Sequence, residues 1–167
     1  LTKMQPLIEQ LAAKVPVVIA SNTSIGAYLQ RYLVQQLAKL LGEDYDIDIM
    51  EKHHRHKVDS PSGTAATLLH DIQAAKKQQY GVDYQSYPLE KGARPEHYIG
   101  MSAARSGNLP GDHSVSFVSA EEMLCVQHVA FDRALFAKGA VRIVEWLKTK
   151  NPVPGIYSMY DVLNLGN

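Results

Sequence analysis

The stretch EKHHRHKVDSPSGTA, residues 51–65, joins a predicted strand to a predicted helix and decides how the chain folds. Residues 44–51 alternate between apolar and polar side chains, which is typical of a strand with one face in solvent. After the stretch, apolar side chains recur at helical spacing from about Thr64 to Gln79. We therefore expect a half-buried strand, a short polar loop and a helix in direct succession.

Further helices are expected on either side of this region, at residues 2–14, 24–41 and 132–148. The last of these carries an apolar face made of Phe136, Ala140, Val141, Val144 and Leu147. Residues 15–20 are almost uninterruptedly apolar and rich in β-branched side chains, which is typical of a central parallel strand buried on both faces. The front of the chain therefore resembles a fragment of an α/β sheet.

Three short strands are expected in the second half, at residues 97–104, 113–119 and 123–130. Residues 105–112 contain two glycines and a proline and form a turn between the first two, so we expect neighbouring strands to pair antiparallel. The element order predicts an α+β body behind the α/β fragment.

Composition limits the possible functions. Seventeen basic and seventeen acidic side chains cancel, so bulk charge favours neither nucleic acid nor a membrane surface as a partner. No apolar run approaches the roughly 20 residues of a membrane helix, and no signal peptide opens the chain. Cys125 is the single cysteine, which suits a reducing cytoplasm, and its apolar neighbours predict a buried, inert thiol. The chain begins at Leu1 within a helical pattern, so we expect a segment of a longer protein.

The basic run at residues 52–57 is the densest chemical signal. Crowded like charges lower the pKa of histidine, which favours neutral imidazoles able to exchange protons, and they attract a dianionic ligand. The alternative is a solvated basic loop. Separated zinc ligands are not evident, and Arg55 and Lys57 oppose a dication, so we expect no metal.

Ser62, Gly63 and Thr64 follow this run at the expected start of a helix. Free N–H groups at a helix N-terminus and the helix dipole bind anions, and a glycine allows the backbone to approach a ligand closely. A carboxylate bound to the amides of Gly63 and Thr64 would find its countercharge in Lys57. The alternative is that these residues only cap the helix. Together with the upstream histidines, they favour a ligand site.

The stretch is very similar to the signature E-x-H-H-x-x-K-x-D-x-P-S-G-T-A of dihydrodipicolinate reductases. Four other segments resemble motifs of the same family: residues 20–26, 105–113, 133–140 and 160–163. The resemblance covers essentially the whole chain. It implies a mixed sheet with helices on one face, which binds substrate and forms a homotetramer. It also implies that the remaining residues are the last α-β piece and the C-terminal segment of a Rossmann-type domain.

The resemblance implies NADH- or NADPH-dependent reduction of hydroxy-tetrahydrodipicolinate, a small dicarboxylate of lysine biosynthesis, by a cytoplasmic enzyme. It makes His53 the proton donor or acceptor and Lys57 its cationic partner and an acid. The substrate carboxylates would be bound by His54, Ser62, Gly63 and Thr64. The nicotinamide would be lined by Ala20, Ser21, Asn22, Thr23, Arg133 and Phe136. The resemblance also implies three segments. Residues 1–23 are the end of a truncated dinucleotide-binding domain, and residues 24–132 form the substrate-binding and oligomerisation domain. Residues 133–167 are a C-terminal helix and tail that belong to the dinucleotide-binding domain again.

Two departures from the family pattern affect this interpretation. The family's glycine-rich βα turn, which holds the pyrophosphate, is missing, so we expect this chain alone to bind dinucleotide poorly. Thr23 stands where relatives often have Phe. A non-catalytic module that oligomerises and binds dicarboxylates is one alternative function, and a metal-binding or unrelated anion-binding domain is another.

Overall fold

The computed structural model describes residues 4–87 and 91–165. These form two units, one comprising the chain up to Tyr28 together with the part from Arg133 onward, and the other comprising Leu29–Asp132. Within the described residues, no helix is both long enough and apolar enough to cross a membrane.

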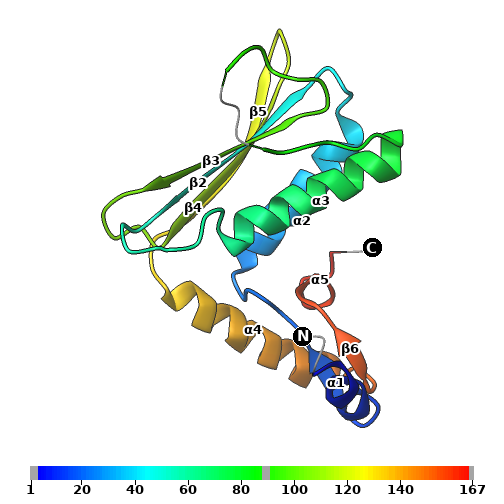
Figure 1. Cartoon of the computed structure of the whole chain (residues 1–167). Coiled ribbons are helices and arrows are strands. Elements are labelled where there is room, and N and C mark those ends of the chain that lie inside the picture. Colours follow the sequence, from blue (N-terminus) through cyan, green and yellow to red (C-terminus); the bar gives the residue numbers. More distant parts are fainter. Residues whose placement is uncertain (1–3, 88–90, 166–167) are drawn as a thin grey trace. The chain divides into compact units, whose positions relative to one another are not determined.

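The second unit is built on a four-stranded mixed sheet with the order β3-β2-β4-β5 (Figure 1). Its strands are β2 (Asp46–His53), β3 (Ile99–Arg105), β4 (Gly111–Val118) and β5 (Met123–Ala130). β2 runs parallel to β3 and antiparallel to β4, which in turn pairs antiparallel with β5. The predicted α+β class with a mixed sheet is therefore confirmed.

The expected pairing of the first two late strands was wrong. β3 and β4 do run in opposite directions, but β2 lies between them and pairs with both. Ile47 and Ile49 of β2 are at most 1% exposed, and burial on this scale favours a central position over an edge. Five residues connect β3 to β4, enough to cross the roughly 10 Å width of one intervening strand.

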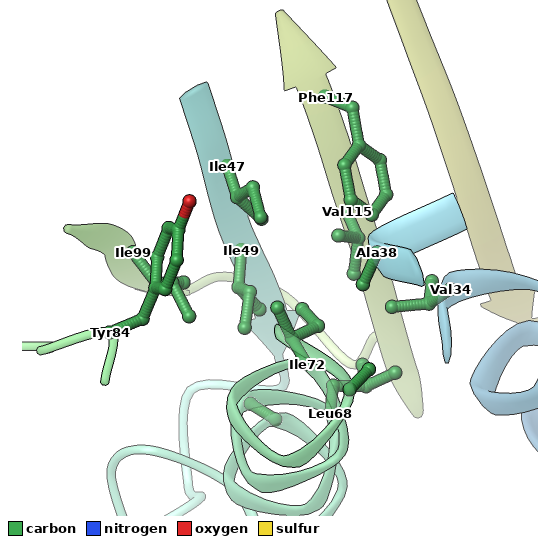
Figure 2. Packing of buried hydrophobic residues seen from close by; sticks show 12 residues of the cluster. Val34, Ala38, Ile47, Ile49, Leu68, Ile72, Tyr84, Ile99, Val115 and Phe117 are labelled. Carbon is green, nitrogen blue, oxygen red and sulfur yellow. The ribbon is translucent and has the colours of Figure 1, made fainter. Parts of the chain in front are cut away.

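Helices α2 (Ile25–Leu40) and α3 (Gly63–Tyr80) cover one face of this sheet. Figure 2 shows the core between them, where apolar side chains from both helices meet those of the sheet. Its fully buried members include Val34, Ala38, Leu68, Ile72, Ile99, Val115 and Phe117. Tight packing of this core fixes which face of β2 points inward, and therefore which polar side chains are buried with it.

Among the described residues of this unit, no helix covers the opposite face of the sheet. Met50 of β2 is 47% exposed there and Met123 of β5 is 62% exposed. Cys125 lies opposite Ser116 in the β4–β5 register and is exposed. The prediction of a buried thiol was wrong, because strand alternation turns Cys125 away from the core residues Val115 and Phe117.

The first unit contains α1 (Gln5–Ala12), β1 (Pro16–Val18), α4 (Ala134–Lys150), β6 (Gly155–Tyr157) and α5 (Met159–Val162), with β1 parallel to β6. The strand is parallel, as predicted, but it belongs to a two-stranded sheet and is only half-buried. Two strands alone cannot cover both faces of an apolar segment, which explains the partial burial.

Helix α4 packs through a different face from the one expected. Phe136, Val141 and Val144 of the predicted apolar face are 38%, 56% and 64% exposed. Instead Gly139 is buried, and Ile143 and Trp146 pack against the cluster of Tyr28, Met159 and Val162. A Cβ at Gly139 would lie 1.7 Å from the backbone oxygen of Thr23, so this glycine sets the contact and the rotation of the helix.

Candidate functional site

The inward face of β2 changes from apolar to ionisable at its end. Ile47, Ile49, Glu51 and His53 alternate with more exposed residues, and all four point into the unit. The strand is two residues longer at this end than predicted, so His53 belongs to the sheet and not to a loop. Its side chain is therefore fixed by strand geometry.

Glu51 is wholly buried and connects several segments. Its Oε1 accepts hydrogen bonds from the backbone N–H of Ser62 (3.1 Å) and from Nη2 of Arg105 (3.2 Å). Burial raises the pKa of Glu51, but the bonds from Ser62 and Arg105 and the charge on His53 leave it below its usual value. The carboxylate is therefore ionised at neutral pH, with its charge fixed inside the unit.

The imidazole of His53 lies next to this carboxylate. Its Nδ1 is 2.7 Å from Oε2 of Glu51, although the angles are too poor for an aligned hydrogen bond, and neither buried atom has a hydrogen-bond partner among the described residues. Burial lowers the pKa of His53, Glu51 raises it, and Lys57 and Arg105 lower it further, with a net decrease from 6.5. The predicted neutral histidine is thus supported, but burial contributes more than charge crowding.

His113 of β4 faces the same space from across the sheet. Its ring centroid is 4.9 Å from that of His53 at an interplanar angle of 73°, and its Nε2 shares a 2.9 Å hydrogen bond with Oγ of Ser62. Burial, followed by the neighbouring His53, lowers the pKa of His113 to about 4. His113 is therefore neutral at neutral pH and provides a polar but uncharged wall beside His53.

In the described part of the chain, Glu51, His53 and His113 place three potential metal-ligand atoms within 4.8 Å of one another. Zinc bonds of about 2.0–2.2 Å require tetrahedral ligand atoms about 3.3–3.5 Å apart. Oε2 of Glu51 lies 2.7 Å from His53 and 3.9 Å from His113, and Arg105 already pairs with the same carboxylate. We interpret the group as a hydrogen-bonded network, and the absence of a metal stays a prediction.

The start of α3 is both a capped helix N-terminus and a possible anion site, which are the two interpretations that the sequence left open. Ser62 is the N-cap, and its Oγ accepts from the N–H of Ala65. Across the described residues, the backbone N–H groups of Gly63 and Thr64 donate to no protein atom. A Cβ added at Gly63 would meet nothing within 4 Å, so the space before this 18-residue helix is open. These amides can bind an anion.

The basic run is attached to the turn that follows β3. The N–H of Ser106 donates to the carbonyl of His53 (2.9 Å), and the N–H of Arg55 donates to the carbonyl of Gly107 (3.1 Å). Gly107 has φ +53°, a conformation that glycine adopts without strain. The run is therefore not a freely solvated loop, because two backbone hydrogen bonds hold it against the turn that follows β3.

Lys57 and His54 lie in the loop before α3. Nζ of Lys57 binds both carboxylate oxygens of Asp59, at 2.8 and 2.9 Å, and this pair lowers the pKa of Asp59. His54 is half-buried, with its ring 6.4 Å from that of His56. The cavities described within each unit, of about 350, 380 and 450 Å³, are lined by residues other than His53, Lys57 and Thr64.

The residues predicted to line a nicotinamide lie in the first unit. Thr23 Oγ1 donates to the carbonyl of Phe136 (2.7 Å), which brings the loop after β1 against the start of α4. Asn22 Oδ1 accepts from the N–H of Ser24 (2.8 Å). Ala20 is half-buried, whereas Ser21 and Arg133 are exposed. Two segments distant in sequence thus meet within this unit.

Sequence reasoning missed four residues of the site: Glu51, Asp59, Arg105 and His113. Glu51 was placed at the end of its strand, and its burial was not recognised. Continuing the two-residue period from Ile49 through Glu51 to His53 would have revealed it. Nothing local in the sequence places Arg105 or His113 beside Glu51, because sheet register alone aligns them.

A family model described as "Dihydrodipicolinate reductase, C-terminus" matches residues 26–163. Curated relatives named 4-hydroxy-tetrahydrodipicolinate reductase include those of Chlamydia felis, Wolbachia pipientis wMel and Akkermansia muciniphila. The first is 41% identical over 90% of this chain, the second 43% over 93% and the third 44% over 95%. The chain spans about 60% of the length of these relatives, at 60%, 60% and 64% respectively.

A solved structure resembles the fold. The dipicolinate-bound dihydrodipicolinate reductase of Paenisporosarcina sp. TG-14 has a TM-score of 0.67 and 22% identity, with 94% of this chain and 58% of that one covered. At this identity the match supports the fold, and the assignment rests on the family model and the curated relatives. The chain therefore belongs to the dihydrodipicolinate reductase family, whose C-terminal part it matches.

Proposed function

We propose that this chain forms the substrate-binding part of an NAD(P)H-dependent 4-hydroxy-tetrahydrodipicolinate reductase of the lysine pathway. The observation that carries the proposal is the pair of free amides at Gly63 and Thr64, on the helix whose N-cap Ser62 is bonded to Glu51 and His113 around His53. The names of the curated relatives and the dipicolinate bound by the Paenisporosarcina enzyme support the choice of a cyclic dicarboxylate.

A planar dicarboxylate needs two anion sites and a proton source. One carboxylate would accept hydrogen bonds from Gly63 and Thr64, where the dipole of α3 also favours negative charge. Lys57 would leave Asp59 to pair with the other carboxylate, assisted by His54. His53 would give a proton to the negative charge that develops during reduction.

The cofactor would be held by the first unit, for which we propose the dinucleotide-binding role expected of residues 1–23 and 133–167. Ala20, Ser21, Asn22, Thr23, Arg133 and Phe136 would line the nicotinamide. The residues fit such a group, because Phe136 is 38% exposed and the polar residues Ser21 and Arg133 are exposed as well. When bound, NADH or NADPH would supply the hydride. A reducing cytoplasm is the compartment we propose, consistent with an exposed thiol at Cys125.

Substitution Lys57→Ala is expected to weaken binding of pyridine-2,6-dicarboxylate by roughly 10- to 100-fold, because it removes a charge-assisted hydrogen bond worth about 1.5–3 kcal/mol. Titration calorimetry on this chain measures the affinity. Lys77→Ala is the matched control, since Lys77 also pairs with an aspartate, Asp83, at 2.6 Å. Equal affinities of Lys57→Ala and the unchanged chain would refute the anion site.

Turnover tests the enzymatic part separately. The protein made from the complete gene is expected to oxidise NADH or NADPH only when 4-hydroxy-tetrahydrodipicolinate is supplied. Binding of the dicarboxylate without turnover would instead identify a non-catalytic module.

We also propose that the uncovered face of the sheet assembles the protein as a homotetramer. Met50, Met123 and Cys125 expose apolar surface on this face, which favours association. Light scattering is expected to give a mass several times that of one chain. Met123→Asp is expected to lower this mass, whereas Val153→Asp, at a 72% exposed position of the other unit, leaves it unchanged. A monomeric unchanged chain would contradict the assembly.

A further inference from the structure

We propose that Glu51 is a positioning residue, which holds a proton on Nδ1 of His53 and thereby makes Nε2 the nitrogen that transfers protons. The transfer step rests on the proposed function, whereas the tautomer itself does not. Glu51 touches no substrate in this arrangement. It acts through the imidazole ring that follows it on the same face of β2.

The carboxylate is itself held in place from two sides. Ser62 N–H fixes Oε1 from the start of α3, and Arg105 fixes it from the end of β3 while also donating to the carbonyl of Asp59 at 2.7 Å. With Oε1 occupied, Oε2 is left for the imidazole 2.7 Å away. Because the donors to Oε1 come from a helix start and a strand end, the Glu51 carboxylate has little freedom to move. A side chain that orients another side chain needs this rigidity.

The charge of Glu51 determines which nitrogen of His53 is protonated. An ionised carboxylate oxygen 2.7 Å from an unprotonated nitrogen would set two lone pairs against each other in a buried space. A proton on Nδ1 converts this repulsion into attraction. The neutral ring therefore carries its hydrogen on Nδ1 and its free lone pair on Nε2.

The surroundings of the two nitrogens agree with this division. Nδ1 is buried with no partner except the Glu51 contact, whereas Nε2 is absent from the buried unpartnered atoms of the described residues. Nε2 lies beside the backbone of Gly111, where an added Cβ would be 3.2 Å away. A glycine there leaves the transferring nitrogen unobstructed. Nε2 is therefore the nitrogen left to exchange protons.

Glu51 also balances the cations that face His53. Lys57 from the loop and Arg105 from β3 disfavour the imidazolium, His113 from β4 is neutral, and Glu51 is the anion among the groups acting on the ring. In the reduction step, the substrate would lose its 4-hydroxyl group and a ring proton as water, and the conjugated imine would then gain a hydride, supplied by the cofactor, and a proton from Nε2 of the doubly protonated ring. His53 is then neutral with Nδ1–H retained, and solvent reprotonates Nε2.

The first experiment uses this chain without substrate. Nitrogen NMR on the histidine-labelled chain is expected to show neutral His53 with Nδ1 protonated and Nε2 unprotonated. In Glu51→Gln, which keeps the shape and the acceptor for Ser62, the side-chain amide can donate to Nδ1, so the Nε2–H form is expected to increase and the pKa of His53 to fall. An Nε2–H tautomer in the unchanged chain would overturn the proposal, whether or not the variant folds.

The second experiment measures kinetics in the protein made from the complete gene. Glu51→Gln is expected to lower kcat on the order of 10²–10⁴-fold, as a wrong histidine tautomer does in a catalytic triad. Affinity for pyridine-2,6-dicarboxylate is expected to stay unchanged, and the limb of the pH profile that follows His53 to move to lower pH. Glu145→Gln, at an exposed position of α4, is the control.

A parallel loss of dicarboxylate affinity and turnover, with an unmoved pH profile, would contradict positioning and indicate a structural role for Glu51. If the NMR result holds but the unchanged protein has no turnover with any substrate, the proposed function fails while the Glu51–His53 arrangement stands. The two hypotheses are thereby tested separately.

Discussion

Replacing His53 by alanine is expected to lower turnover on the order of 10²–10⁴-fold in the protein made from the complete gene, because it removes the general acid. Affinity for the cofactor should change little, since His53 is not among the residues proposed to bind it. Steady-state kinetics and a separate cofactor titration measure the two quantities.

The pH dependence gives a second measurement on the same variant. Burial places the pKa of His53 below 6.5 in the free chain, so its protonated form is abundant below that pKa and declines as the pH rises through it. A bound dianion would move this pKa upward. The decline is expected to disappear in His53→Ala. His56→Ala, an exposed histidine of the same basic run, should leave rate and profile unchanged, and equal losses in both variants would remove His53 from the mechanism.

Replacing Gly139 by alanine is expected to destabilise the first unit by about 2 kcal/mol net, because a clash at the upper end of the usual overpacking cost of about 1–3 kcal/mol outweighs the gain in helix propensity. The added Cβ would lie 1.7 Å from the backbone oxygen of Thr23, and no side-chain rotation relieves a clash with backbone. Alanine gains only about 1 kcal/mol over glycine in helix propensity. The net effect is therefore unfavourable, and α4 must move away from the loop after β1.

Urea unfolding measures the change in stability, and hydrogen exchange of the α4 amides reports on this unit directly. Gly63→Ala is the matched control, because its Cβ would meet nothing within 4 Å and it is expected not to destabilise the chain. If Gly139→Ala unfolds at the same urea concentration as the unchanged chain, the close contact between α4 and Thr23 is refuted.

Local pattern predicted the elements of this fold well. The helical spacing of residues 24–41 and the alternation of residues 44–51 correspond to α2 and β2, since both patterns follow from the direction of successive side chains along the backbone. Strand order was not predictable in this way. Residues 97–104 and 113–119 were predicted as consecutive strands joined by a short turn. In the structure, β2 lies between them in the sheet, so strands that are neighbours in the sequence are not neighbours in the sheet.

The exposure of individual side chains was also decided by tertiary contacts and not by the local sequence pattern. The sequence neighbours of Cys125 are apolar. Its side chain nevertheless faces outward, because the pairing with Ser116 in the strand register decides which side of the sheet it lies on. The apolar face of α4 at Val141 and Val144 is exposed because Gly139 turns another side of the helix toward Thr23. Periodicity predicts that a face is apolar, but not what covers it.

The sequence by itself determined the α+β class, the helix start near Thr64 and the identity of His53, Lys57, Gly63 and Thr64 as candidates, because these depend on residues adjacent along the chain. Only the tertiary structure placed Arg105 and His113 beside Glu51 and His53. Three strands meet at that point, and a carboxylate acquires its fixed charge and its imidazole partner only when packing excludes water and the sheet sets which residues face each other.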